Sequence, residues 1–582
     1  MTLKLTSAFH SNLLMTNTSP TYLYSSQQVY AMEQDWFNEG YSSFALMQQA
    51  AWQIAQHIIE LNEKRQSSLE SGYQRKTQSP RACVWVGHGN NGGDGWLVAY
   101  YLQQAGWQVQ IITVGIDHID NAGSTENHAV SSSMSDAKKA QQIALKANCH
   151  YQRFEDIKNR DLECDNCLQA DVYVDALFGI GLDRAPAGVY EQAIHLFTQT
   201  AQQVAALVAA IDIPSGLVAS TGQVFEGVAI QADVTLCLVA RKFGLHTKDG
   251  MDYAGELIDI PLIPYKPTKP AAKLLKSAYR LSARQQNSYK GSYGHVLVIG
   301  GNRVDGSQGM GGAAILSSAS AMATGTGKIT VACHEAFHGA LLTSLPDAMT
   351  IDLHDQQGVK SLIKEASVIA IGMGLGRDEK AKNVFTSYLQ AAMVQNCAIV
   401  IDADGLYHLA SLYTDNNKLV NELLDYSQSH QVCLTPHSGE AARLLNKKVS
   451  AIESDRLAAI KKGAETYGGN WVLKGAGSLV LENDQLYVCG TGNAGMASAG
   501  MGDVLSGVIA GLLAQQDLTE QQRSLHQAVL IHGLAGDILI ELPAYKAESK
   551  TFSHLPLLIG QRGLQAQDMP AAIRHVMQSL MY

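Results

Sequence analysis

The chain has 582 residues, which is too long for one hydrophobic core and predicts two to four domains. Charged residues make up 16% of it and hydrophobic residues 46%, a balance that predicts large buried interiors and a homo-oligomer. The formal net charge of −10 argues against nucleic acids and anionic membranes as main partners, and no apolar run approaches the roughly 20 residues that span a bilayer. Nine scattered cysteines fit reduced thiols, so we expect a cytoplasmic enzyme.

The first half predicts helices alternating with strands. Residues 27–59 predict two helices broken near Gly40, and the polar residues 62–80 predict an exposed loop. Buried strands are then predicted over residues 82–86, 108–114 and 171–176. Residues 204–211 continue a helix or begin a strand, and they place Asp212 at a strand end. This alternation predicts a doubly wound parallel sheet, with its ligand site at the carboxyl ends of the strands.

A glycine-rich string over residues 87–95 follows the first of these strands and precedes a predicted helix over residues 96–105. Taken alone, its Gly-x-Gly-x-x-Gly spacing is typical of a Rossmann dinucleotide site. The adjacent Asn90 and Asn91, together with Asp94, also suit a hard cation and amide or ribose contacts. The residues alone leave both interpretations open.

The string from His88 to Gly95 resembles the NAD(P)H-hydrate epimerases, the YjeF N-terminal family, and the blocks 175–182 and 211–216 match that family as well. The resemblance implies a Rossmann-like epimerase domain over residues 20–262 and a potassium ion held by Asn91, Asp175 and Ser215. It also implies contacts with a hydrated NADH or NADPH from Asn90, Asn91, Gly92, Gly93, Asp94, Gly179, Ile180, Gly181, Leu182, Asp183, Arg184, Ala185 and Asp212. The alternative for Asp175 and Asp212 is a buried carboxylate satisfied by backbone amides.

The chemistry of this substrate suggests roles for two carboxylates. A hydrated nicotinamide carries a hydroxyl at C6 beside the ring nitrogen, and inverting that centre needs proton transfer without redox change. Asp212 is therefore the candidate catalytic base, with Asp94 as a helper.

Prolines 261, 264, 267 and 270 recur at every third residue. This spacing favours an extended polyproline II segment, so we predict a proline-rich linker over residues 263–280. A second domain is then expected over residues 281–582.

The second half repeats the α/β pattern. It predicts a strand at 295–299, a small-residue helix at 311–323, and strands at 328–332, 368–371, 398–402, 432–434, 471–475 and 478–481. Helices over residues 524–542 and 571–580 close the chain. The fold class is therefore α/β, with two doubly wound domains.

The glycine-rich stretch 490–511 runs directly into an apolar helix near Asp503. Unpaired backbone N–H groups and the positive end of the helix dipole converge there, which predicts an anion site. Asp503 can cap this helix or take a proton from an attacking hydroxyl.

Residues 499–503 resemble the anion-hole motif of ribokinase-like enzymes, and the longer string 493–507 resembles the NAD(P)H-hydrate dehydratases. The resemblance implies a ribokinase-like domain that converts ADP, with Mg²⁺, to AMP and phosphate, and it gives Asp503 the role of catalytic base. It implies hydrate contacts at Ala313, Gly374, His437 and Asp503. It also implies nucleotide contacts at Lys474, Gly475, Ala476, Gly477, Ser478 and Gly502.

Further residues of this half have two interpretations each. His437 is a hydrate contact or a turn histidine. Asp402 is a candidate to help hold magnesium near the phosphates of the nucleotide, whereas Asp404 is either a site residue or a helix N-cap.

The combined prediction is a bifunctional nicotinamide-nucleotide repair enzyme that epimerises the R and S hydrates and dehydrates the S form. The main alternative is a ribokinase-like small-molecule kinase with a non-catalytic N-terminal domain. A decapping scaffold is a second alternative, and a Rossmann dehydrogenase, for which no hydride partner is found, is a third.

Overall fold

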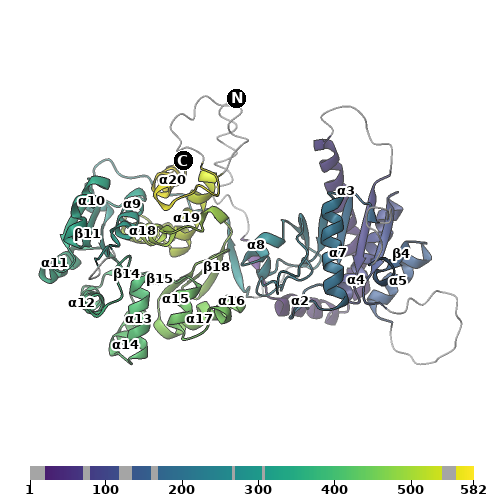
Figure 1. Cartoon of the computed structure of the whole chain (residues 1–582), viewed down its shortest axis with the longest axis horizontal. Coiled ribbons are helices and arrows are strands. Elements are labelled where there is room, and N and C mark those ends of the chain that lie inside the picture. Colours follow the sequence, from purple (N-terminus) through teal and green to yellow (C-terminus); the bar gives the residue numbers. More distant parts are fainter. Residues whose placement is uncertain are drawn as a thin grey trace. The chain divides into compact units, whose positions relative to one another are not determined.

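The computed structural model of the chain describes residues 20–69, 79–116, 134–158, 168–264, 269–303, 309–540 and 559–581. The chain divides into two compact units, one over Tyr22–Ala272 and one that consists mainly of the residues from Lys273 onward (Figure 1). Each unit is built on its own sheet, as the repeated α/β pattern predicts. In the described part of the chain, no helix is long and apolar enough to cross a membrane.

The first unit contains a sheet of seven described strands in the order β4-β3-β2-β5-β6-β7-β8, and all neighbouring pairs are parallel. The strands are β2 (Arg81–Val86), β3 (Gln108–Thr113), β4 (His150–Arg153), β5 (Val172–Ala176), β6 (Leu207–Ile211), β7 (Val234–Leu238) and β8 (Glu256–Ile260), and β1 (Tyr22–Leu23) precedes them. The helices are α2 (Ser26–Asn38), α3 (Ser43–Leu69), α4 (Asn90–Gln104), α5 (Asp136–Lys146), α6 (Phe154–Ile157), α7 (Val189–Gln203) and α8 (Gly250–Tyr253).

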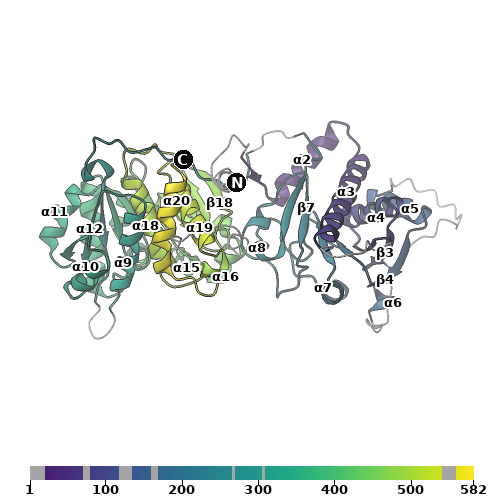
Figure 2. The same cartoon turned by 90° about the horizontal axis from the view of Figure 1, so that it is seen from above.

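Side chains of successive strand residues point to opposite faces, and both faces of this sheet are apolar. On one face, Val84 and Val174 pack with Trp96 of α4 and with apolar residues of α3 and α5. On the other, Trp85 packs with Phe197 of α7. The predicted doubly wound arrangement is therefore confirmed for this unit (Figure 2).

Two local predictions in this unit are wrong. Helix α3 continues to Leu69, so part of the predicted exposed loop 62–80 is helical, and Asn62 is buried. Residues 70–78 lie outside the described residues. Helix α4 begins at Asn90, so most of the predicted glycine loop forms its first two turns.

The second unit has the strand order β9-β18-β17-β16-β15-β14-β13-β10-β11-β12. The strands are β9 (Ala272–Leu275), β10 (His295–Ile299), β11 (Lys328–Cys333), β12 (Met349–Asp352), β13 (Val368–Ile371), β14 (Ala398–Ile401), β15 (Val432–Leu434), β16 (Asn470–Leu473), β17 (Leu479–Glu482) and β18 (Gln485–Cys489). The seven strands β16, β15, β14, β13, β10, β11 and β12 are all parallel to their neighbours in this group. Strand β17 runs antiparallel to both of its neighbours, β16 and β18.

Helices cover both faces of this second sheet (Figure 1). Val298, Val400 and Val472 pack against a layer of apolar helices. That layer contains α9 (Gly311–Ala323), α18 (Met501–Ala514), α19 (Leu525–Ile540) and α20 (Met569–Ser579). The remaining helices are α10 (His338–Ser344), α11 (Gln356–Glu365), α12 (Glu379–Val394), α13 (Asp404–Thr414), α14 (Lys418–Tyr426), α15 (Ser438–Leu444), α16 (Val449–Ser454) and α17 (Arg456–Tyr467).

Part of the predicted linker 263–280 belongs to a sheet of the fold. Residues 272–275 form β9, which pairs in parallel with β18, and Ala278 is fully buried. The last proline of the repeat is Pro270, so the backbone N–H groups after it are free to join a sheet. Residues 265–268 lie outside the described residues.

Each sheet reverses its winding direction once. In the first unit the reversal lies between β2 and β5, and in the second it lies between β10 and β13. Ligands of open α/β sheets bind in the crevice outside the carboxyl ends of the strands at such a reversal. The segments that follow these four strands contain the predicted site residues 90–94, 179–185, Ala313 and Gly374, and the remaining ones lie within β5, follow other strands or lie at the start of α18.

Candidate active sites

The three residues predicted to hold potassium meet at the carboxyl ends of β2, β5 and β6. Ser215 donates its hydroxyl to Asp175 Oδ1 at 2.6 Å and its backbone N–H to Oδ2 at 2.7 Å. Asn91 donates to the carbonyl of Phe178 at 2.6 Å, and the N–H of Phe178 donates to the Ser215 hydroxyl at 2.9 Å. Burial raises the pKa of Asp175 to about 6, against the lowering effect of these hydrogen bonds.

This cluster is rich in oxygen atoms, which are the ligands that hard cations prefer. It contains one carboxyl group, one hydroxyl, one side-chain amide and a backbone carbonyl, and the carboxyl group is fully buried. A bound monovalent cation would balance that charge. The donor set therefore fits the predicted potassium ion.

The glycines at the start of α4 allow close packing. A Cβ at Gly92 would lie 2.0 Å from the carbonyl oxygen of Gly87, and one at Gly93 would lie 2.9 Å from Cα of Ala137. Both glycines are buried, whereas Asn90 is exposed beside them. Packing thus accounts for Gly92 and Gly93 whether or not a ligand contacts their backbone.

The loop after β5 contains the other predicted hydrate contacts. Gly179, Ile180 and Leu182 are half-buried, and Gly179 lies next to Asn91. Gly181, Asp183, Arg184 and Ala185 are exposed. The structure therefore brings the beginning of this loop to the cluster predicted to hold potassium and leaves its second half open to solvent.

Asp212 follows β6, which is the predicted position at a strand end, and its side chain is buried. Its Oδ1 accepts the backbone N–H of Leu238 at 3.0 Å and the ammonium group of Lys242, whose side chain is fully buried. The alternative of a carboxylate satisfied by backbone amides is correct only in part, because a lysine supplies the second bond. Lys242 was missed by the sequence analysis.

Two further carboxyl groups interact electrostatically with Asp212. Asp94 is buried, and burial together with the charges of Asp212 and Glu33 raises its pKa well above its usual range. Glu33 of α2 has a pKa of about 7, raised by burial and by Asp212 and lowered in part by Lys242. Glu33 was also missed, because it lies on a helix far from every glycine block in the sequence.

The second candidate site lies at the start of α18. The N-cap is Gly500, with φ +89°, and Asp503 is the third helical residue. Asp503 is therefore not the N-cap residue of this helix and lies in its first turn instead. Burial and the neighbouring carboxylates of Asp402 and others raise the pKa of Asp503 to about 7 although Lys474 lowers it. A carboxyl group that titrates near neutrality is suited to act as a general base.

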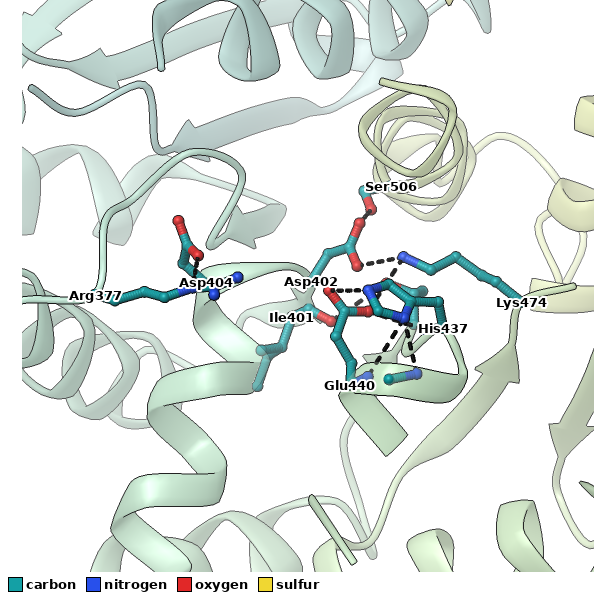
Figure 3. Close-up of polar contacts among 10 residues, drawn as sticks. Arg377, Ile401, Asp402, Asp404, His437, Glu440, Lys474 and Ser506 are labelled. Atoms are coloured by element: carbon teal, nitrogen blue, oxygen red, sulfur yellow. Dashed lines mark hydrogen bonds and ion pairs between the residues drawn. The ribbon is translucent and has the colours of Figure 1, made fainter. Parts of the chain in front are cut away.

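Asp402, Lys474 and Ser506 form a network (Figure 3), and Asp402 and Lys474 interact electrostatically with Asp503. Lys474 at the end of β16 donates to Asp402 Oδ1 at 2.8 Å, and Ser506 of α18 donates to Oδ2 at 2.5 Å. Glu440 lies 3.7 Å from the same ammonium group. Burial opposes the charge of Lys474, but the two carboxylates raise its pKa, so the lysine is a stable cation. A Cβ at Gly502 would lie 3.1 Å from Lys474 Nζ, which places this charge over the helix N-terminus.

The predicted hydrate contacts lie on several loops of the same edge. Gly374 has φ +64°, and a Cβ there would lie 3.2 Å from Cβ of Ala313, so these two residues are neighbours. His437 is the N-cap of α15, where Nδ1 accepts the N–H of Gly439 at 2.9 Å. The His437 ring is 59% exposed, and Nε2 lies 3.5 Å from Glu440. His437 is therefore a turn histidine whose ring is still accessible to a ligand.

Asp404 is not an N-cap. It is the first residue of α13, and its carboxylate accepts the N–H of Gly376 at 2.9 Å and Nε of Arg377 at 2.7 Å (Figure 3). Asp404 thus anchors the glycine turn that follows β13.

Arg456 stabilises the predicted nucleotide loop 474–478 through hydrogen bonds to its backbone. This buried arginine donates to the carbonyls of Leu473 at 3.0 Å and Ala476 at 2.7 Å. Gly475 and Gly477 both have positive φ, which favours glycine at these positions. Gly475 and Ala476 are exposed and Ser478 is half-buried, so part of the loop is open to a ligand.

A cavity of about 710 Å³ lies at the opposite edge of the second sheet. Its lining includes Ser367, Ala398 and Gln431, which stand at the amino ends of β13, β14 and β15. None of the predicted site residues lines it.

Within the described residues, no cluster of three or more His, Cys, Asp or Glu side chains is arranged to hold a metal ion.

Comparisons with known proteins agree with the two resemblances. A family described as YjeF-related protein N-terminus matches residues 43–244, and NAD(P)H-hydrate dehydratase matches residues 296–555. The bifunctional NAD(P)H-hydrate repair enzyme Nnr of Coxiella burnetii is 31% identical over 93% of this chain and 99% of its own length. The protein of the same name from Vibrio cholerae is 32% identical over 96% and 98%.

A similar solved structure is that of ADP/ATP-dependent NAD(P)H-hydrate dehydratase from Bacillus subtilis, co-crystallised with ATP/Mg²⁺. The alignment covers 52% of this chain and 95% of the Bacillus subtilis chain, at 23% identity and a TM-score of 0.39. The two curated relatives match along nearly their full lengths, and both family matches fall in the units that contain the corresponding motifs. The chain therefore belongs to the family of bifunctional NAD(P)H-hydrate repair enzymes.

Proposed function

We propose that the chain repairs hydrated NADH and NADPH in two steps. The first unit interconverts the R and S hydrates, and the second unit dehydrates the S hydrate while ADP is converted to AMP and phosphate. The observation that carries the proposal is the Asp503 carboxyl, which has a raised pKa and lies in the first turn of a glycine-rich helix beside the Lys474 ammonium group. This arrangement suits phosphoryl transfer to a hydroxyl.

In the dehydratase step, Asp503 takes the proton of the C6 hydroxyl while the hydroxyl oxygen attacks the β-phosphorus of ADP. The bond from this phosphorus to the bridging oxygen breaks, and AMP leaves. The N–H groups of residues 499–502 and the charge of Lys474 stabilise the transferring phosphoryl group. The phosphate then leaves with the C6–O electron pair while the ring nitrogen donates its lone pair, and loss of a proton from C5 restores the dihydropyridine. Ala313, Gly374 and His437 would contact the hydrate, and Lys474, Gly475, Ala476, Gly477, Ser478 and Gly502 would contact the nucleotide.

Mg²⁺ usually reaches such sites with the phosphates of a nucleotide and binds one or two carboxylates as well. Each oxygen of Asp402 accepts one hydrogen bond and keeps a second lone pair, so Asp402 would be the carboxylate that reaches the ion. The ion would neutralise phosphate charge.

In the epimerase step, Asp212 acts as the base and Asp94 as its helper. Inverting C6 requires a group that protonates the departing hydroxyl and a group that takes a proton from the returning water. Asn91, Asp175 and Ser215 would hold K⁺, whose charge would order the loops at the ends of β2, β5 and β6. Asn90, Gly92, Gly93 and the loop 179–185 would contact the hydrate.

The test uses an equal mixture of R and S hydrates and follows absorbance in the reduced-nicotinamide band, with ADP, ATP or no nucleotide. Full recovery of NADH with ADP is expected from the wild-type chain. Asp212→Ala should recover only the S fraction rapidly, followed by slow spontaneous epimerisation. Asp252→Ala, which removes an exposed carboxylate of the same unit, is the matched control.

Absence of nucleotide-dependent recovery would refute the dehydratase assignment. Accumulation of a stable phosphorylated product would instead indicate a small-molecule kinase. Equal recovery by the wild type and Asp212→Ala at early times would refute the assignment of Asp212.

A further inference from the structure

Asp212 directly follows β6, and its partner Lys242 lies four residues after the end of the neighbouring parallel strand β7. The Lys242 ammonium group contacts Asp212 Oδ1 and donates to the carbonyl of Leu238 at 2.7 Å. Leu238 in turn donates its N–H to the same Oδ1 at 3.0 Å. Asp212 Oδ1 therefore has two donors, whereas no described residue forms a hydrogen bond with Oδ2 in the structure.

Backbone strain accompanies this contact. Asp212 has φ +68°, and the N–H of Ile213 bonds to the carbonyl of Ile211 at 2.8 Å, which is the pattern of a classic γ-turn. A second such turn is centred on Val239, with φ +63° and a bond of 2.7 Å from Ala240 to Leu238. Positive φ is a genuine outlier for a β-branched residue. Strain of this kind persists where the surroundings over-determine it, and it is concentrated at functional sites.

Lys242 is held in place by the segment before α2 as well as by β7. Tyr24 donates its N–H to Arg241 at 2.9 Å and accepts the N–H of Phe243 at 2.8 Å, so the backbone is paired on both sides of the lysine. The Lys242 side chain is fully buried. A buried lysine loses its hydration and is retained as a cation only with a charged partner.

The groups that face Asp212 are Lys242, Glu33 from α2, Asp94 from α4 and the thiol of Cys237 from β7. Among these described groups, Lys242 is the only cation. It pairs with Asp212, and neither Glu33 nor Asp94 forms an ion pair in the described structure. The site therefore contains one carboxylate, Asp212, that is paired with a cation. It also contains two carboxyl groups, Glu33 and Asp94, in which burial favours the protonated form. Such a division is the usual sign of separate base and acid roles.

We propose that Lys242 is a positioning residue of the epimerase, which fixes Asp212 Oδ1 and balances its charge so that Oδ2 accepts a proton from the water that returns to C6. The inference rests on the proposed function of the first unit. Protonated Glu33 or Asp94 gives its proton to the departing hydroxyl, which leaves C6 as water while the ring nitrogen supplies the electron pair. Water then adds to the other face, and its proton passes to Oδ2, so the number of protons in the site is unchanged after one inversion.

Three full-length variants test this role. Lys242→Met removes the charge and keeps a linear side chain, Lys242→Arg keeps the charge, and Lys146→Met changes an exposed lysine at the end of α5 as the control. The epimerase rate is measured on the R hydrate with ADP and an excess of the Asp212→Ala chain, which supplies dehydratase activity. Dehydratase activity on the S hydrate is measured in every variant as the internal control.

For Lys242→Met we expect an epimerase kcat lower by about 100-fold, within the range typical of general base catalysis. The limb of its pH profile that reports the base should move to higher pH, because loss of a nearby cation disfavours the ionised carboxylate. Lys242→Arg should keep the wild-type position of that limb. A purely structural role for Lys242 would lower the rate without moving the limb, and that result would overturn the proposal.

A double-variant comparison covers the case in which Lys242→Met does not fold. Asp212→Asn with Lys242→Met removes both buried charges, which avoids an unpaired charge in the core. If Lys242 acts through Asp212, the double variant should have the same epimerase rate as Asp212→Asn alone. A further loss of tenfold or more in a folded double variant would refute the proposal. Absence of epimerisation in the wild-type chain would instead refute the proposed function itself.

Discussion

Replacement of Asp503 by Asn tests the second site most directly, because it removes a charge and changes few atoms. Loss of a general base typically costs 10²–10⁴-fold in rate, so we expect the dehydratase kcat to fall by about that factor. The epimerase activity resides in the other unit and should be unchanged. Asp517→Asn, which alters an exposed carboxylate shortly after α18, is the matched control.

The same substitution should make the second unit more stable. The pKa of Asp503 is raised from 3.8 to about 7 in the folded chain, so the folded state binds this proton more tightly than the unfolded state does. Ionisation therefore costs stability as the pH rises from about 4 through 7. At 1.36 kcal/mol per pH unit the full cost above pH 7 is at most about 4 kcal/mol. Asparagine carries no charge, so Asp503→Asn removes this cost at pH 8 and changes little near pH 4.

Calorimetry at several pH values between 4 and 8 measures the effect as a difference in the unfolding temperature of the second unit. The difference between Asp503→Asn and the wild type should grow with pH and level off above about 7. A variant that is inactive but gains no stability with pH would contradict the raised pKa. Loss of both activities in a folded protein would refute the model of two separate sites.

Two other substitutions test one feature in each unit. Ser215→Ala removes the hydroxyl bonded to Asp175 and should cost about 1–3 kcal/mol of stability. It should also abolish any stimulation of the epimerase by KCl relative to an organic cation, and undiminished stimulation would exclude Ser215 as a ligand. Gly502→Ala places a methyl group 3.1 Å from Lys474 Nζ and should lower kcat/KM for ADP roughly tenfold, or about 1.4 kcal/mol, with epimerase activity unchanged. An unaltered kcat/KM for ADP would show that the nucleotide does not depend on this close approach.

Much of the architecture was predictable from local pattern. Strands β10 and β13 and helix α9 have the bounds predicted for them, because buried strands and a small-residue helix each have a characteristic composition and period. The carboxyl-end positions of Asp175, Asp212 and Asp402 also follow from the sequence, since each ends or follows an apolar strand. The helical start at Asn90 was not predictable in this way, because glycines are poor helix formers and the close packing of Gly93 against Ala137 depends on the tertiary fold.

The sequence by itself determined two α/β domains, their glycine-rich loops and the family to which the chain belongs. Only the tertiary structure decided the charge partners. Lys242 is 30 residues from Asp212, Lys474 is 72 residues from Asp402, and Ser506 is 104 residues from Asp402. Parallel strands bring such distant residues together because their carboxyl ends share one edge of a sheet. Local periodicity in the sequence does not show which distant residues lie close together in the fold. It also does not show the burial that raises the pKa of Asp503 and Glu33.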